Sequence, residues 1–181
     1  MPRRPDLGCR AGTPLPAQQA EPAPFKGRKH LRRLERIFET IPGPIYYLTC
    51  CVRDRRPVLA HPKMAEVLVS AWKTSPDVYG WIVGRYVVMP DHVHLFAAAC
   101  SEEAKILSGF IGSWKRWTKR NLQARGMTTF EWQPEFFDHV LRSAESYGQK
   151  WDYVRNNPVR AQLVASPDDW PFQGELSVLQ W

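Results

Sequence analysis

Two histidines separated by one residue, His92 and His94, have the types and spacing that most directly suggest chemistry in this 181-residue chain. Valine, leucine and phenylalanine surround them, which predicts a strand. In a strand, positions i and i+2 lie on one face, so the two imidazoles would be neighbours. Neutral imidazole nitrogens bind divalent cations, and such a cation needs at least one more donor. Buried, hydrogen-bonded histidines have the same spacing, so this alternative stays open.

A second pair of functional side chains lies near the end of a predicted helix. At about 100° per residue, Tyr153 and Asn157 lie on one arc, one turn apart. A phenol and an amide in this arrangement suit an attacking oxygen beside a metal-binding oxygen. Alternatively, Tyr153 packs in the core and Asn157 caps the helix before Pro158. The buried stripe of the same helix is predicted to consist of Tyr147, Trp151 and Val154.

The charge balance indicates a polyanionic partner. Lys and Arg total 25 against 18 Asp and Glu, which gives a net charge of +7, and such a field attracts nucleic acids. One predicted helix has a basic side, and we expect it to contact DNA phosphates. Its cations are Lys115, Arg116, Lys119 and Arg120. A solvated helix face has the same appearance, so charge alone does not decide.

Several classes of protein are excluded by length and composition. No apolar run approaches the ~18 residues of a membrane span, so no membrane partner is expected. No apolar segment follows the basic N-terminus, so we expect a cytoplasmic, nucleoid-associated protein. The 4 cysteines form no C-x-x-C pair, which argues against a zinc ribbon and a disulfide framework. No P-loop motif is present, so no nucleoside triphosphate is implied.

The elements that must position these residues follow in the order strand, helix, strand, strand, helix, strand, helix. This order predicts an α+β fold, a ferredoxin-like split βαβ antiparallel sheet with helices packed on one face. The sixth segment is the least regular and is either a strand or an extended loop. The segments are residues 45–52, 62–75, 81–89, 92–99, 102–122, 128–133 and 143–157. An irregular tail is expected after them.

Three regions divide the chain. Residues 1–24 contain 6 of the 16 prolines, a composition that predicts a disordered tail. Residues 25–44 have apolar residues near helical spacing among many cations, which predicts a basic N-terminal helix or arm. Residues 45–181 form the expected catalytic domain.

Three blocks in a fixed order resemble a known family. The first, Tyr86–Phe96, contains the H-x-H pair, and the others are Phe136–Arg142 and Tyr153–Ala161. Together they resemble the REP-associated tyrosine transposases, relatives of the insertion-sequence transposases with one catalytic tyrosine. The resemblance covers roughly residues 45–172. Two positions depart from it: Asp91 stands where many relatives have Asn, and Leu163 follows Gln162 where Gly is common.

The resemblance implies an enzyme that cuts and rejoins hairpin-containing single-stranded DNA through a 5′-phosphotyrosine intermediate. It places His92 and His94 on metal ligands, Tyr153 on the nucleophile and Asn157 on a further ligand position. Histidine and amide ligands suit Mg²⁺ or Mn²⁺. The oligomeric state, monomer or homodimer, is left open.

Four other functions remain to be distinguished. A domesticated, non-cleaving DNA-binding protein would use the same surface without needing Tyr153. A metal-dependent hydrolase would bind zinc at the histidines and use water as its nucleophile. A histidine-triad nucleotide hydrolase fits less well, because Phe96 occupies the position of a third alternating histidine. A basic scaffold would simply bury the histidines.

Overall fold

The computed structural model describes residues 43–127 and 130–179. The predictions for residues 1–24 and for the basic arm, residues 25–44, lie outside the described residues, apart from the last two positions of the arm. Among the described residues, no helix has the length and apolar character needed to cross a membrane.

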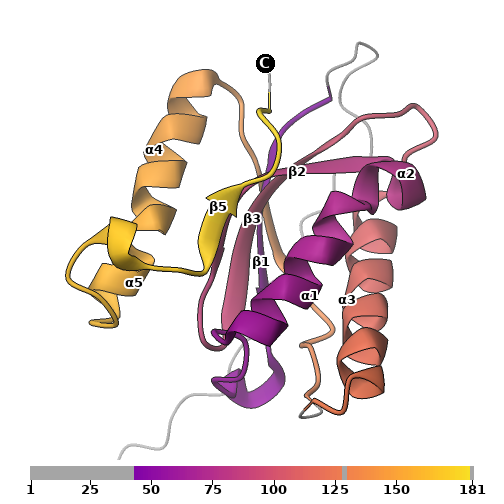
Figure 1. The fold of residues 1–181 in the computed structure, drawn as a ribbon. Coiled ribbons are helices and arrows are strands. Elements are labelled where there is room, and N and C mark those ends of the chain that lie inside the picture. Colours follow the sequence, from indigo (N-terminus) through magenta and orange to yellow (C-terminus); the bar gives the residue numbers. More distant parts are fainter. Residues whose placement is uncertain (1–42, 128–129, 180–181) are drawn as a thin grey trace, which may run out of the picture. The chain divides into compact units, whose positions relative to one another are not determined.

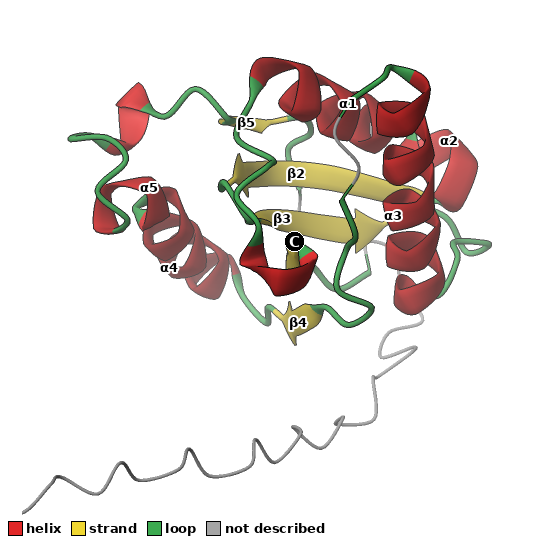
Figure 2. Ribbon diagram, turned by 90° about the horizontal axis from the view of Figure 1, so that it is seen from below, coloured by secondary structure: helices red, strands yellow, loops and turns green. Residues whose placement is uncertain are grey.

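A five-stranded antiparallel sheet forms the centre of the described domain, in the order β4-β1-β3-β2-β5. The first four strands follow the ferredoxin-like order, so the predicted split βαβ sheet is confirmed. Figure 2 shows β4 and β5 at opposite edges. The strands are β1 (Tyr46–Cys51), β2 (Trp81–Val88), β3 (His92–Ala99), β4 (Phe137–Val140) and β5 (Gln173–Glu175).

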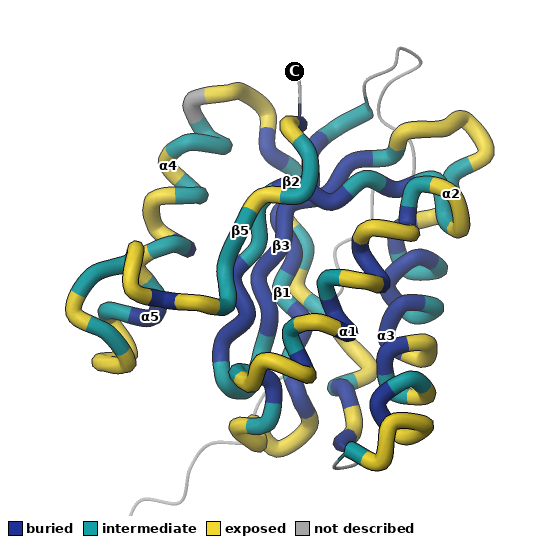
Figure 3. Tube along the Cα trace, viewed as in Figure 1, coloured by how far each residue is buried: buried dark blue, intermediate teal, exposed yellow. Residues whose placement is uncertain are grey.

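One face of the sheet is covered by α1 (Pro62–Lys73), α2 (Ser75–Tyr79) and α3 (Leu107–Ala124). The apolar stripes of α1 and α3 meet there, with the rings of Trp72 and Trp114 stacked at 5.6 Å. Both side chains are almost fully buried, and the buried strands between the helices are visible in Figure 3. This larger core keeps β1 and β3 rigid.

The other face is covered by α4 (Ala144–Arg155), which Figure 1 shows across the sheet from α1 and α3. The expectation that all helices lie on one face is therefore wrong. The reason lies in β3, which is buried on both sides: Leu95 belongs to the α1–α3 core, whereas Phe96 packs at 4.8 Å against Tyr147 of α4. The predicted stripe of α4 is confirmed, because Val154 is fully buried and Trp151 lies 6.2 Å from Phe96.

The last two strands differ from the prediction. The fourth strand is β4, whereas in the segment 128–133 Trp132 forms only an isolated bridge with Val52. Its indole donates a hydrogen bond to Thr118 of α3, which anchors the segment to that helix instead. The tail that was predicted to be irregular contains a 3-10 turn, Pro167–Asp169, followed by the strand β5. The turn after β1 is also a 3-10 turn, Arg53–Arg55.

The last predicted helix ends at Arg155, and α5 (Asn157–Arg160) begins immediately afterwards. Pro158 has no N–H group to donate to the carbonyl of Val154, so the hydrogen-bond ladder is interrupted there. A similar break separates α1 from α2. Pro76 lies in the first turn of α2, where a missing N–H costs nothing. Asn157 therefore begins its own short helix.

Candidate metal and nucleophile site

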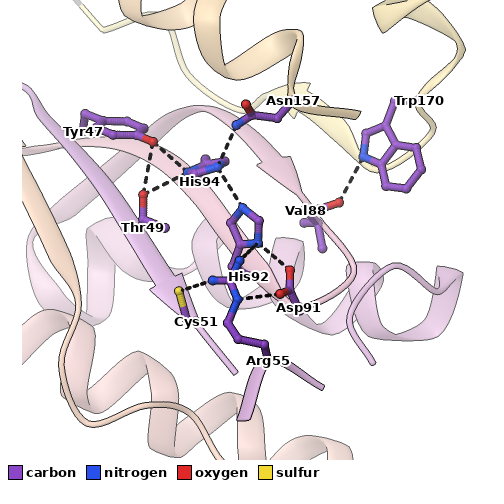
Figure 4. A network of polar contacts seen from close by, with 10 residues as sticks. All are labelled: Tyr47, Thr49, Cys51, Arg55, Val88, Asp91, His92, His94, Asn157 and Trp170. Atoms are coloured by element: carbon purple, nitrogen blue, oxygen red, sulfur yellow. Dashed lines mark hydrogen bonds and ion pairs between the residues drawn. The ribbon is translucent and has the colours of Figure 1, made fainter. Parts of the chain in front are cut away.

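The two histidines of β3 lie side by side on the sheet face that α4 covers. Their Nε2 atoms are 3.0 Å apart and their rings are nearly perpendicular, at 84°. His94 is buried, with 6% of its surface exposed, and His92 is partly exposed. Figure 4 shows the pair at the centre of a polar network. The predicted juxtaposition of the two imidazoles is confirmed.

The proton of His94 is located by its neighbours. Asn157 Nδ2 lies 2.9 Å from Nε2, and an amide N–H can only donate, so Nε2 carries a lone pair. Nδ1 then carries the proton and faces two hydroxyl oxygens, those of Tyr47 at 2.8 Å and Thr49 at 2.9 Å. Thr49 is the direct cross-strand partner of His94. The neighbouring strand β1 and the start of α5 thus fix this ring.

His92 is oriented by a carboxylate. Its Nδ1 lies 2.6 Å from Asp91 Oδ1, and the other carboxylate oxygen accepts from Arg55 Nε at 2.6 Å. Nδ1 therefore carries the proton, and Nε2 again presents a lone pair. Arg55 also donates to Cys51 Sγ at 2.9 Å. Arg55 and the preceding Asp54 both have positive φ, 53° and 57°, a costly backbone conformation at the site.

Both imidazoles are neutral at neutral pH. Burial lowers the pKa of His94 to about 3, with further lowering from the charges of His92, Arg55 and Lys150. Burial also lowers the pKa of His92, although the hydrogen bond to Asp91 opposes the shift. The two Nε2 atoms lie 3.0 Å apart, and with both protons on Nδ1 their lone pairs would repel each other unless a cation shared them. This arrangement fits a divalent metal ion bound between His92 and His94.

A third ligand would have to come from Asn157. The described residues contain no group of three His, Cys, Asp or Glu suited to a metal ion, and the amide oxygen of Asn157 is the side-chain donor that the sequence predicts. The Oδ1 atom of Asn157 accepts from Arg160 Nη1 at 3.4 Å, and its Nδ2 faces His94. Ligation by Oδ1 requires the amide to rotate by about 180°. The role of Asn157 as a ligand stays a prediction.

Tyr153 lies outside this cluster, on the exposed side of α4. It is 53% exposed, and no hydrogen bond in the described part of the chain joins it to His92 or His94. The guanidinium of Arg160 lies 4.6 Å from the centre of its ring. A hydrogen bond and the charge of Arg160, with a smaller effect from Lys150, lower the pKa of Tyr153. The phenol is accessible and has an electropositive environment, as a nucleophile requires.

Lys150 connects Tyr153 to the histidines. Its ammonium lies 5.2 Å from the ring centre of Tyr47 and 5.7 Å from that of Tyr153. Tyr47 contacts His94 directly, and the two tyrosines interact electrostatically. Tyr153 and the histidine pair therefore border one electropositive surface. The nucleophilic role of Tyr153 stays a prediction.

The predicted DNA-binding residues of α3 have different environments. Lys115 is buried, at 7% exposure, and its ammonium donates to the carbonyl oxygens of Gln133, Glu135 and Pro134 at 2.7, 2.9 and 3.4 Å. Lys115 is therefore buried and hydrogen-bonded within the fold, which argues against the predicted DNA contact.

The other three cations of α3 remain at the surface. Arg116 and Arg120 are exposed, and the partly exposed Lys119 pairs with Glu131. They belong to a helix on the face of the sheet opposite the histidines. Any DNA contact that they make is therefore separate from the metal site, and this role stays a prediction.

Five residues that orient the site are absent from the predicted set: Tyr47, Thr49, Arg55, Asp91 and Arg160. Thr49 and Tyr47 are recognisable only from the β1–β3 register, because they lie more than 40 positions from His94 in the sequence. Arg160 had a usable signal, since it follows Tyr153 at the helical spacing i+7. The predicted helix ends before Pro158, so Arg160 lies outside it and the spacing did not predict this contact.

Comparison with known proteins places this site in a family. The family model described as "Transposase IS200 like" matches residues 42–157. The chain belongs to the IS200-like transposase family. The matched residues include His92, His94, Tyr153 and Asn157, whereas Arg160 and β5 lie beyond them.

Individual relatives agree with this family assignment. A REP-associated tyrosine transposase of Escherichia coli (strain K12) is 26% identical over 135 residues, which cover 73% of this chain and 76% of the relative. A candidate REP-associated tyrosine transposase of Haemophilus influenzae is 23% identical over 140 residues, which cover 72% and 78%. A solved structure of a REP-associated tyrosine transposase bound to a REP hairpin has a TM-score of 0.61 at 26% identity, covering 77% of this chain and 81% of that one. The family predicted from the three sequence blocks is confirmed.

Proposed function

We propose that this IS200-like transposase is a metal-dependent endonuclease and strand transferase that acts on hairpin-containing single-stranded DNA through a 5′-phosphotyrosine intermediate. The observation that carries the proposal is the 3.0 Å approach of the Nε2 atoms of His92 and His94, beside a helix that presents an exposed tyrosine. The likeness to a transposase bound to a REP hairpin supports the substrate class. We expect the protein to bind this DNA in the cytoplasm.

Tyr153 is the proposed nucleophile. Its oxygen forms a bond to the scissile phosphorus, and the bond from phosphorus to the 3′ oxygen breaks. The phenol proton is released to solvent, and the departing 3′ oxygen takes up a proton to become a hydroxyl. Arg160 favours the reaction by stabilising the phenolate, consistent with the lowered pKa of Tyr153.

The phosphotyrosine bond retains the free energy of the broken phosphodiester. A second 3′ hydroxyl can therefore attack it and reseal the strand without ATP. In that step the Tyr153 oxygen is the leaving group, and the environment of Arg160 stabilises it again.

His92, His94 and a rotated Asn157 would hold Mg²⁺ or Mn²⁺. When bound, the ion would polarise the scissile phosphate and offset the charge that builds on its oxygens. Asp91 keeps the proton of His92 on Nδ1, and Tyr47 and Thr49 keep that of His94 on Nδ1. These partners hold both Nε2 lone pairs in position before the ion arrives.

Arg116, Lys119 and Arg120 are the proposed contacts to phosphates distant from the cleavage point. Because they neutralise phosphates, we expect DNA binding to weaken steeply between low and moderate salt. A flat salt titration would contradict an electrostatic contact by these residues.

The proposal is tested by incubating the protein with labelled single-stranded hairpins and Mg²⁺ or Mn²⁺, followed by a denaturing gel. We expect a covalent protein–DNA species that disappears in Tyr153→Phe and in samples with chelator. Tyr147→Phe is the matched control, because Tyr147 lies on the same helix but packs against Phe96, and it should retain the adduct.

Each alternative has its own outcome in the same assay. Loss of the adduct in Tyr147→Phe alone would show that the other phenol is the nucleophile. Cleavage without an adduct would favour the hydrolase that uses water. Binding without cleavage, unchanged in Tyr153→Phe, would favour the non-cleaving DNA-binding protein.

A further inference from the structure

We propose that the exposed face of the edge strand β4 is a stacking subsite for one unpaired nucleobase, with Phe137 as its platform and Lys150 as the contact to the adjoining phosphate. The inference rests on the proposed function and deepens it, because it assigns a position to a nucleotide next to the scissile bond. Phe137 is 45% exposed, an unusual state for a phenylalanine within a sheet.

The strand places Phe137 on the catalytic face. In the β1–β4 register, Phe137 is opposite Thr49 and His139 is opposite Tyr47. Cross-strand partners point to the same side of a sheet, so both β4 side chains share the face of His94. Both are exposed, whereas the alternating residues Asp138 and Val140 are partly buried. The edge of the sheet thus presents two rings to solvent beside the candidate site.

A short chain of contacts joins this surface to the histidines. The ring of Phe137 lies 6.0 Å from that of Tyr47 in an edge-on geometry of 65°. The hydroxyl of Tyr47 contacts His94 Nδ1 at 2.8 Å. Only one side chain separates the platform from a proposed metal ligand, so a base on Phe137 belongs to a nucleotide adjoining the cleaved phosphate.

Lys150 supplies the complementary charge. Its ammonium lies over Tyr47 and near Tyr153, at 5.2 and 5.7 Å from the ring centres. In the part of the chain that the structure describes, no ion pair is formed between Lys150 and a carboxylate. An aromatic face beside a cation is the recognition chemistry of single-stranded nucleic acid. Paired bases in a duplex do not expose their faces, so the occupant is an unpaired nucleotide.

The test is a coupling experiment on binding, carried out with the full chain in a Tyr153→Phe background so that no adduct forms. Affinities are measured for a hairpin with an unpaired flank and for versions with an abasic site at each unpaired position in turn. Phe137→Leu removes the platform, and Phe137→Trp keeps an aromatic face. Trp117→Leu is the matched control, because Trp117 is 37% exposed but belongs to α3 on the opposite face.

We expect Phe137→Leu to weaken binding of the intact hairpin about tenfold, and Phe137→Trp to retain most of the affinity. At one abasic position the difference between the two variants should vanish, because the stacked base is already missing. Trp117→Leu should show no such coupling at that position. Lys150→Gln should weaken binding to every oligonucleotide and reduce the salt dependence by about one phosphate contact.

An equal effect of Phe137→Leu on all abasic oligonucleotides, or no effect on any, would overturn the inference. Failure of the proposed function is measured separately, because it would appear as the absence of a covalent adduct between the wild-type protein and DNA on the denaturing gel. A covalent adduct without coupling at Phe137 would refute only the stacking subsite.

Discussion

Lys115→Met tests whether this lysine stabilises the fold or contacts DNA. Its ammonium donates two short hydrogen bonds, to Gln133 and Glu135 at 2.7 and 2.9 Å, and a long one to Pro134 at 3.4 Å. A hydrogen bond to a charged group contributes about 1.5–3 kcal/mol net. Methionine retains most of the side-chain volume but leaves these carbonyls without their donor.

The two short bonds together correspond to about 3–6 kcal/mol, and relief from burying the charge recovers part of it. We therefore expect a loss of about 3 kcal/mol in the free energy of unfolding. With a urea slope of about 1.5 kcal/mol/M, the midpoint should fall by about 2 M. The melting temperature should fall by roughly 6–12 °C.

The measurement is a urea titration followed by circular dichroism, beside a DNA-binding titration at a temperature where both proteins are folded. Arg120→Met is the control, because Arg120 is exposed on the same helix. We expect Lys115→Met to lower the free energy of unfolding and leave the affinity for DNA unchanged. We expect Arg120→Met to weaken DNA binding and leave the free energy of unfolding unchanged. A change of less than about 1 kcal/mol in Lys115→Met, together with weaker DNA binding, would refute a structural role for Lys115.

Three further predictions concern the site. Because burial lowers the pKa of His94 to about 3 in the folded state, its contribution to stability is complete above about pH 6.5 and is lost as the pH falls toward 3. Metal-free protein should lose about 2 kcal/mol between pH 7 and 5 from this group, and His94→Gln should flatten the profile in chemical denaturation. Asp91→Ala should weaken metal binding about 10–100-fold in calorimetric titrations while the fold is retained; unchanged affinity would contradict the orienting role of Asp91. Arg160→Ala should move the pH profile of adduct formation to higher pH, because Arg160 lowers the pKa of Tyr153, and an unshifted profile would exclude this role.

The first three strands and the helices between them were predictable, because their apolar residues follow the strand and helix periods. The two-sided burial of β3 also had a signal: Val93, Leu95 and Phe96 are apolar on both faces of the strand, which is typical of a sheet covered on both sides. The extent of β4 was not predictable, because a four-residue segment with polar residues and no buried apolar face has the sequence pattern of a loop. Trp132 resembles a strand residue but is held by α3 instead.

Lys115 shows where charge is a poor guide to exposure. It follows Ile111 by four residues and precedes Thr118 by three, so it lies on the buried stripe of α3 and not on the basic side. That spacing is visible in the sequence. The three carbonyl partners of Lys115 cannot be recognised in the sequence, because they belong to a segment whose position depends on tertiary packing.

The histidine pair followed from strand geometry alone, but the relation of Tyr153 to Asn157 did not follow from helical spacing. The break at Pro158 makes Asn157 the first residue of α5, so its amide reaches His94 while Tyr153 remains exposed. A continuous helix would keep both side chains on one arc and in one environment. The break therefore separates the partly buried Asn157, the predicted ligand, from the exposed Tyr153, the predicted nucleophile. Arg160, on α5, contacts both residues, so replacing this guanidinium would change the surroundings of the Tyr153 phenol and of the Asn157 amide together.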